Sequence, residues 1–259
     1  MAHHEVTVGM ATAQRRLPEL DGTIEELGAT DRGELAQHWL SRSASERRVA
    51  DSFVVIHRTL SEHQAPDALV RLAARAVEDE YRHAELARQV ASRFQGADLP
   101  SPPLLQLKVP EHQGASPALK RTLFIVGQCA LNETFASAVL EASLEAATGP
   151  LAKEALRELL ADEIDHARIG WAHLATLDAP GRAEFQPWLI PLVRDNLQMW
   201  RSTPRDYPTN PALVSQGALT TELLEGALQA ATRELVVPGL QHLGISTDAL
   251  ARWLEQTQP

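Results

Sequence analysis

Two short motifs in this sequence combine an acidic pair with a histidine. They are Asp79-Glu80-Tyr81-Arg82-His83 and Asp162-Glu163-Ile164-Asp165-His166. In each motif the Glu and the His are three positions apart, so on a helix both side chains point to the same side. A carboxylate and an imidazole on one face are suited to bind a metal ion. One Glu-x-x-His could arise by chance or form a charged surface pair, but a second copy with an Asp in the same place favours a metal site.

The composition favours an all-α protein. Alanine, leucine, glutamate and arginine are frequent, and only 5% of the 259 residues are aromatic. The formal net charge of −10 argues against nucleic acid as a partner. The single Cys129 excludes a disulfide framework, a four-cysteine metal site and an iron–sulfur cluster within this chain. Residues 1–10 do not resemble a signal peptide and no stretch approaches a membrane span, so we expect a soluble, cytoplasmic protein.

The positions of glycine and proline predict four long helices, over residues 31–62, 66–94, 116–147 and 150–177. The first of them begins with Asp31 and Glu34, spaced as in a capping box. Residues 96–116 contain two glycines and four prolines, which prevent a regular helix but leave enough chain to cross the length of a bundle. This order predicts a four-helix bundle made of two antiparallel hairpins joined by a long crossover.

The remaining residues are assigned to the ends of the same domain. We expect residues 1–30 to form an N-terminal arm, residues 31–178 the bundle, and residues 179–259 additional C-terminal helices. These helices would pack on the outside of the bundle or in a subunit contact, and a homodimer is compatible with the second arrangement.

Hairpin geometry predicts a further carboxylate beside each motif, because residues equally far from the turn of an antiparallel hairpin lie at the same height. With a turn near Gln64, the neighbour of Glu80 lies near position 48, and Glu46 stands there on the apolar face. With a turn near Gly149, the neighbour of Glu163 lies near position 135, close to Glu133. Six side chains should therefore converge: Glu46, Glu80, His83, Glu133, Glu163 and His166. Such a set of four glutamates and two histidines holds two metal ions in bundle proteins.

Other residues near these six have candidate supporting roles. Asp79 and Asp162 are suited to accept the free N–H of a coordinated histidine, each serving the histidine of the other motif. Cys129 and Ser137, one turn either side of Glu133, could line an oxygen or substrate pocket or be ordinary core residues. Small residues near the site could leave a substrate cavity or allow close helix packing: Ala76, Ala84, Ala87, Ala130, Ala136, Ser137, Ala167 and Gly170.

Four further residues leave alternatives open. Arg82 and Asp165 occupy the same motif position with opposite charges, so they could form a bridging ion pair or lie on solvated faces. His57 and His173 could join the site, although a satisfied core or rim histidine is the commoner role.

The motifs resemble those of the ferritin-like superfamily over residues 31–178, and its di-iron carboxylate oxygenases more than its storage ferritins. Asp79-Glu80-Tyr81-Arg82-His83 is similar to the Asp-Glu-x-Arg-His motif of bacterial multicomponent monooxygenases, whereas the second motif has Asp165 in place of the arginine. The chain departs from ribonucleotide reductase small subunits, because Ala87 stands where the radical tyrosine is expected. It also lacks the cysteine cluster of rubrerythrin.

The resemblance implies an oxidoreductase with two iron ions, or with Mn/Fe or Mn/Mn, held by the six side chains named above. It implies that the enzyme activates O2 to oxidise a small organic substrate. Because the sequence has no flavin, NAD or cluster motif, electrons must come from an external donor. A ferroxidase or peroxide-scavenging protein that handles the metal itself is the main alternative, and a metal-free interaction module is a third.

Overall fold

The computed structural model describes residues 17–202 and 210–257, and all regular structure in these ranges is helical. The helices at the start of the chain are α1 (Gly22–Glu25), α2 (Ala29–Glu62) and α3 (Asp67–Gln95). After a long connection come α4 (Pro117–Ile125), the π-helix η1 (Val126–Asn132), α5 (Glu133–Ala146) and α6 (Pro150–Ala175). The C-terminal part contains α7 (Ala179–Phe185), the 3-10 helix η2 (Gln186–Trp188), α8 (Leu189–Ser202), α9 (Pro211–Val214), α10 (Thr221–Ala231), the π-helix η3 (Thr232–Val236), α11 (Val237–His242) and α12 (Asp248–Thr257). The all-α fold class expected from the sequence is confirmed.

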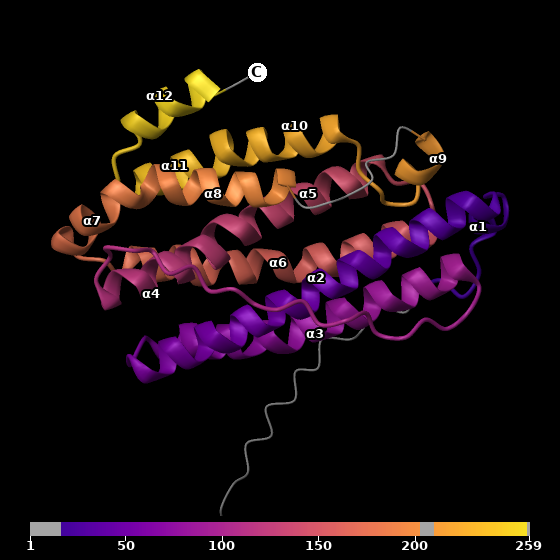
Figure 1. Ribbon diagram of the computed structural model, residues 1–259, viewed down its shortest axis with the longest axis horizontal. Coiled ribbons are helices and arrows are strands. Elements are labelled where there is room, and N and C mark those ends of the chain that lie inside the picture. Colours follow the sequence, from indigo (N-terminus) through magenta and orange to yellow (C-terminus); the bar gives the residue numbers. More distant parts are fainter. Residues whose placement is uncertain (1–16, 203–209, 258–259) are drawn as a thin grey trace, which may run out of the picture.

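The long helices pack in pairs (Figure 1). Helix α2 lies along α3, and α5 together with η1 lies along α6. The two pairs meet mainly where α3 packs against α6, which are the helices that carry the two Glu-x-x-His motifs. The packing therefore brings the two motifs to a common interface.

Local sequence signals set most helix ends. Gly96 takes a left-handed conformation with φ 74° and ends α3. Ser116 accepts a hydrogen bond from the backbone N–H of Leu119 and begins α4. Helix α2 differs from expectation because it begins at Ala29 after Gly28, with no side-chain cap, so the expected capping box at Asp31 does not form. Asp31 instead accepts a hydrogen bond from the Asn210 side chain at 3.1 Å.

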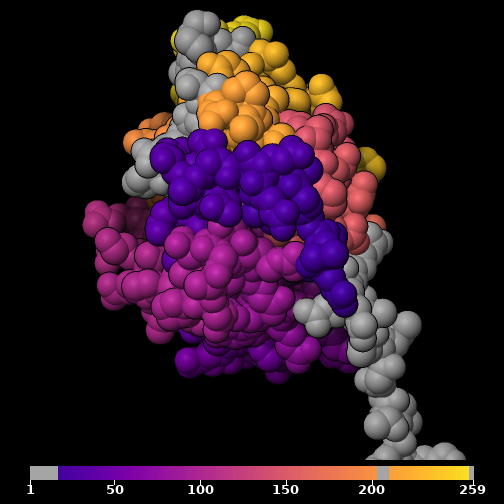
Figure 2. Space-filling model, turned by 90° about the vertical axis from the view of Figure 1, so that its right-hand side faces the viewer, coloured from indigo at the N-terminus to yellow at the C-terminus, as the bar shows by residue number. Residues whose placement is uncertain are grey.

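Residues 97–116 form the long connection without a helix and lead from the end of α3 to the start of α4 (Figure 1). At the end of the molecule seen in Figure 2, α1 and the start of α2 (indigo) lie between the magenta segment around the end of α3 and the orange segment at α9. A hydrogen bond from the Leu151 backbone N–H to Asp21, 2.8 Å long, joins the chain before α1 to the start of α6. The first sixteen residues of the expected arm lie outside the described residues.

The C-terminal helices pack on the helix that carries Glu133. Helix α10 contacts α5, α8 contacts η1, and α12 contacts α8. Buried side chains from these elements share one apolar core, including Phe135, Leu192 and Leu228. The sequence left two locations open for these helices, the outside of the long helices or a subunit contact. The structure shows them in contact with the long helices. The division of the chain into arm, bundle and C-terminal helices stays a prediction.

The third long helix is not the continuous α-helix that the sequence suggested. Its centre, Val126–Asn132, is a π-helix that ends directly before Glu133. Such segments often lie at functional sites because they shift the side chains that follow them. The widened backbone approaches α6 at Gly170, where an added Cβ would lie 2.2 Å from the backbone nitrogen of Ala130. Gly170 and Ala130 thus serve close helix packing.

The segment Pro117–Ala146 corrects one expectation from the sequence. By length and composition it is apolar enough to cross a membrane, although no stretch was expected to approach this. In the structure, 72% of its most apolar window is buried inside the protein. A helix in the core of a folded protein can have the same length and composition as a helix that crosses a membrane. This segment also carries the buried Glu133.

The contact between α6 and η1 predicts that Gly170→Ala destabilises the protein. The added methyl group has backbone atoms on its far side and cannot be accommodated by a side-chain rotation, so we expect a loss of about 1–3 kcal/mol in the free energy of unfolding. Gly226→Ala in α10 is the matched control, because a Cβ there meets nothing within 4 Å and alanine favours a helix. Urea unfolding measures both. Equal stability of the two variants would contradict the close contact.

Candidate metal centre

Four of the six expected ligands form one buried cluster. Atoms of Glu80, Glu133, Glu163 and His166 all lie within 4.8 Å of one another. Glu80 and His166 come from α3 and α6, and Glu163 stands one turn before His166 on α6. Glu133 begins α5 directly after the π-helix. A group of three carboxylates and one imidazole at this spacing could hold a metal ion.

Both motif histidines turn their Nδ1 atoms toward the carboxylates. His166 Nδ1 lies 3.0 Å from Glu80 Oε1 and 3.5 Å from Glu163 Oε2. His83 Nδ1 lies 3.7 Å from Glu80 Oε2 and 3.8 Å from Glu163 Oε1. Glu80 and Glu163 therefore stand between the two imidazoles, whose ring centres are 5.9 Å apart.

The opposite ring nitrogens face the aspartates crosswise. His83 Nε2 lies 3.1 Å from Asp162 Oδ2, and His166 Nε2 lies 3.5 Å from Asp79 Oδ2. Each aspartate therefore stands beside the histidine of the other motif, as the crosswise arrangement requires. An N–H held by a carboxylate at Nε2 leaves the lone pair at Nδ1, where a metal ion would bind.

Glu46 stands at the edge of the cluster. Its Oε1 lies 3.5 Å from Arg42 Nη1, one helical turn earlier. Burial, together with the nearby charge of Glu80, raises the pKa of Glu46 to about 7. The structure thus places Glu46 near the cluster but outside the tight group of four.

Glu133 is held by the end of the π-helix. Its Oε1 accepts hydrogen bonds from the side-chain amides of Gln128 at 2.6 Å and Asn132 at 3.2 Å. Trp200 of α8 donates in turn to Asn132 Oδ1 at 3.1 Å, so a C-terminal helix helps to orient this carboxylate. Burial, and then the charges of Glu163 and Glu80, raise the pKa of Glu133 well above its usual value.

Without metal, the charge balance of the cluster depends on protons. Burial alone would lower the pKa of His83, but the hydrogen bond with Asp162 and the charge of Glu80 outweigh it and raise this pKa to about 10. Burial also opposes the charge of His166, yet Asp79, Glu163 and Glu80 raise its pKa. The two imidazolium groups thus supply the positive charge that bound cations would otherwise bring.

Unsatisfied polar atoms indicate that the site fits a metal. Within the described ranges, both oxygens of Glu80, Oε2 of Glu163 and the Nδ1 atoms of His83 and His166 are buried and form no hydrogen bond of good geometry, so these carboxylates and imidazoles face only one another. Buried carboxylates and imidazoles without partners are costly, and native proteins rarely leave them so. These atoms point toward a common centre, as metal ligands do.

An ionic network lies behind the crosswise aspartates. Arg82 pairs with Asp79, with Asp162 and with Glu158, the last at 2.7 Å. Despite its burial, Asp162 has a lowered pKa, because His83 and Arg82 donate hydrogen bonds to it. Arg82 does not face Asp165, whose partners are Arg75 and Arg168. The ion pair between Arg82 and Asp165 that the motif positions suggested is therefore not formed. Arg82 pairs with Asp79, Glu158 and Asp162 instead.

The structure also places the remaining candidate residues. Cys129 is fully buried, and Ser137 donates its hydroxyl hydrogen bond to the backbone of Glu133. His173 lies 3.3 Å from the Thr122 hydroxyl, and the metal-ligand group in the described chain includes neither His173 nor His57.

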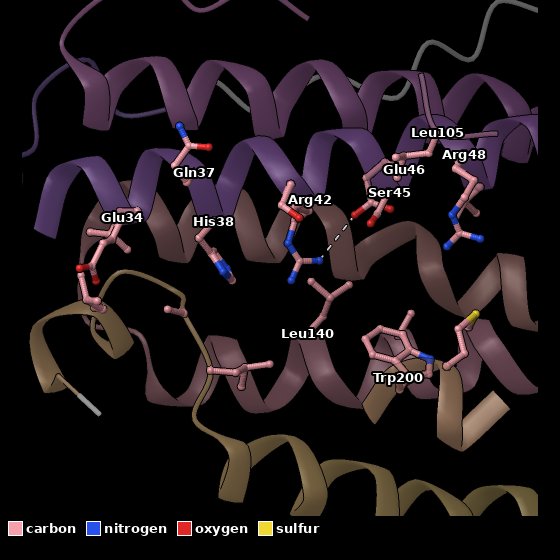
Figure 3. A pocket seen from close by; sticks show the side chains of 18 of the residues that line it. Glu34, Gln37, His38, Arg42, Ser45, Glu46, Arg48, Leu105, Leu140 and Trp200 are labelled. Atoms are coloured by element: carbon pink, nitrogen blue, oxygen red, sulfur yellow. Dashed lines mark ion pairs between the residues drawn. The ribbon is translucent and has the colours of Figure 1, made fainter. Parts of the chain in front are cut away.

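A cavity of about 840 Å³ includes two members of the cluster in its lining. Figure 3 shows the cavity from close by. It lies between α2 and the helices α5 and α8, and Glu46, Glu133 and Glu163 form part of its wall. Ala136 is the member of the small-residue set that lines it, whereas its described lining includes neither Cys129 nor Ser137. The volume falls in the range of pockets for small organic ligands.

The sequence reasoning missed several residues of this region. Gln128 stands five residues before Glu133, the spacing that a π-helix aligns, and Asn132 directly precedes Glu133. Trp200 comes from a helix with no motif. Arg42 could have been found, since it stands four residues before Glu46 on the same helix face.

No protein-family model, curated protein or solved structure matches the chain. The candidate site therefore depends on its own geometry, which is a buried carboxylate and imidazole cluster that could bind a metal ion beside a cavity.

The protonated histidines predict that metal affinity rises with pH. Because the pKa of His83 is raised to about 10, this residue carries a proton at neutral pH, and a metal ion must displace it. We expect Mn(II) to bind about tenfold more tightly per pH unit for each proton displaced. Calorimetry in buffers of different ionisation enthalpy counts the released protons. Glu141→Gln, on the exposed side of α5, should keep this dependence, and an affinity that is constant with pH would contradict it.

The crosswise aspartates predict a second effect on metal affinity. Asp162→Asn removes the carboxylate that orients His83, so we expect about 10- to 100-fold weaker Mn(II) binding. Asp165→Asn is the matched control. Asp165 belongs to the same motif, but its carboxylate pairs with Arg75 and Arg168 and does not contact His83. Equal Mn(II) affinities of the two variants, measured by calorimetry, would show that Asp162 does not position the ligand.

Proposed function

We propose that this protein is a non-haem di-iron oxygenase or oxidase that uses O2 to oxidise a small organic substrate. The observation that carries the proposal is the cavity whose wall includes Glu46, Glu133 and Glu163. A protein that only stores or detoxifies metal ions needs a path for ions, whereas a cavity of about 840 Å³ beside the cluster has room for an organic molecule.

The order and packing of the helices support a ferritin-like four-helix bundle as the scaffold. Two long helix pairs are separated by the connection 97–116, and each pair supplies one Glu-x-x-His motif and one further glutamate. Bundle di-metal carboxylate proteins use this combination of ligands. The six residues proposed to hold two iron ions, or a Mn/Fe or Mn/Mn pair, are Glu46, Glu80, His83, Glu133, Glu163 and His166.

The residues of the chain have separate tasks in this proposal. Bound iron ions would supply the redox chemistry that consumes O2. Glu80 and Glu163, between the imidazoles, would neutralise the charge of two cations. Asp162 would fix the ring orientation of His83 through its contact with Nε2, and Asp79 lies 3.5 Å from Nε2 of His166. The apolar side chains around the cavity exclude water from a bound substrate.

The proposal also includes partners. Electrons come from an external donor, and O2 and a small molecule are the substrates. The protein works in the cytoplasm, with neither nucleic acid nor a membrane as a partner, and a homodimer is the proposed assembly.

Iron stoichiometry under air tests the proposal against the metal-handling alternative. After anaerobic loading with Fe(II), the protein is exposed to O2 while oxygen uptake and iron absorbance are followed. We expect oxygen uptake to stop when about two irons per chain have reacted. Continued oxidation of excess Fe(II) into a mineral would favour a ferroxidase instead.

Matched variants assign this reaction to the cluster. Glu133→Gln should abolish the uptake of oxygen by Fe(II)-loaded protein, whereas Glu141→Gln on the exposed side of the same helix should not change it. A chain that binds no transition metal even after anaerobic reconstitution would overturn both the oxygenase and the ferroxidase.

A further inference from the structure

We infer that the cavity beside the cluster binds an organic acid, with Arg42 as the anchor for its carboxylate. The inference rests on the proposed function for the reaction at the cluster, and it adds the chemical class of the substrate. Its basis is the uneven distribution of polar and apolar side chains over the cavity wall.

The two sides of the cavity differ in character (Figure 3). Helix α2 contributes a polar side, with Glu34, Gln37, His38, Ser41, Arg42, Ser45 and Arg48. The opposite side is mostly apolar and includes Ala136, Leu140, Met199, Trp200, Leu213 and Leu219. Figure 3 shows His38 and Arg42 extending from α2 toward the side where Leu140 and Trp200 lie. A ligand that fills this space needs a polar group on one side and an apolar body on the other.

Arg42 is the cation best placed to bind the polar group. Its side chain is only 15% exposed, and its Nε is buried without a hydrogen-bond partner among the described residues. Its ion pair with Glu46 is 3.5 Å long, which exceeds the 2.7–2.9 Å typical of a charge-assisted hydrogen bond. The guanidinium also lies 5.9 Å from the ring centre of Trp39, which limits its movement. Among the described residues, the Nε–H of Arg42 is therefore left without an acceptor, which a ligand could supply.

The charges around Arg42 favour an anion. Arg48 also lines the cavity, and it forms no ion pair with any residue in the ranges 17–202 and 210–257. Glu34 lies about 12 Å from Arg42 along α2, near the other end of the cavity. When Glu46, Glu133 and Glu163 share their charge with metal ions, this part of the cavity is left with an excess of arginine.

A carboxylate fits this arrangement better than the other common polar groups. The planar guanidinium can bind both oxygens of a carboxylate at once. An ammonium group would be repelled by Arg42 and Arg48, and an alcohol would leave the buried charge of Arg42 without a counter-ion. The apolar side of the cavity then covers the hydrocarbon part of the acid.

Binding of three matched probes to the full chain tests the inference. The probes are octanoate, octan-1-ol and octylamine, which share an apolar chain and differ in the charge of the polar group. Calorimetry is carried out on the metal-free and the Mn(II)-loaded protein. We expect octanoate to bind at least about tenfold more tightly than octan-1-ol to the Mn(II)-loaded protein, and octylamine to bind most weakly. In the metal-free form we expect a smaller preference for octanoate, because no metal ion offsets the carboxylates of Glu46, Glu133 and Glu163 on the cavity wall. Equal affinities, or a preference for the amine, would overturn the inference.

Variants then assign the preference to Arg42. Arg42→Gln should remove most of the preference for octanoate over octan-1-ol, and Arg42→Lys should retain part of it because the charge remains. Arg58→Gln, on the same helix in an exposed pair with Glu62, should behave like the parent protein. Because the affinity for octan-1-ol is measured on each variant, a loss of folding would show as a loss of both ligands. A folded Arg42→Gln variant with an unchanged preference would refute the assignment.

The design separates this inference from the proposed function. A carboxylate preference that exists in metal-free protein and depends on Arg42 supports the inference even if iron and O2 do not react. A preference that appears only with Mn(II) and does not depend on Arg42 shows that the acid binds the metal instead, which overturns the inference while the metal site remains.

Discussion

The structure depends on placing several carboxylates together inside a helical core. Glu80, Glu133 and Glu163 lie within a few ångströms of one another and are almost fully buried. Such a group is unstable unless positive charge accompanies it, because burial and mutual repulsion both disfavour ionised carboxylates. Two histidines, with raised pKa values, carry that charge as protons in the metal-free chain. A metal ion bound by this group could take over the same role.

Other parts of the fold serve this group of charges. The crosswise aspartates lie at the far sides of the histidine rings, and Arg82 links them by ion pairs to the buried Glu158. On the opposite side, the π-helix and Trp200 orient Glu133. One face of the site is therefore closed by ionic contacts, whereas the other opens to a cavity. Because of this asymmetry, a buried group that could hold a metal ion has one side next to a cavity.

The cavity gives α2 two functions. The helix supplies Glu46 at the edge of the cluster and, one turn earlier, Arg42 on the cavity wall. An anion held at Arg42 would lie close to the carboxylates of the cluster without itself binding a metal ion. With the proposed function, the same helix would place the bound substrate beside the metal ligands, which brings reacting groups together.

The sequence by itself determined the helical class, the long helices Ala29–Glu62, Asp67–Gln95 and Pro150–Ala175 to within a few residues, and the four residues that form the buried cluster, because each depends on local periodicity or on distance from a turn. The full set of six metal ligands stays a prediction. Tertiary structure decided the rest. The interruption at Val126–Asn132 arises where α6 approaches the backbone at Gly170, and no local pattern predicts such a contact. The start of α2 at Ala29 and the partners of Arg82 depend on residues distant in sequence. The cavity likewise depends on how α8 and α5 pack against α2, since a space between helices is a property of their arrangement rather than of any one of them.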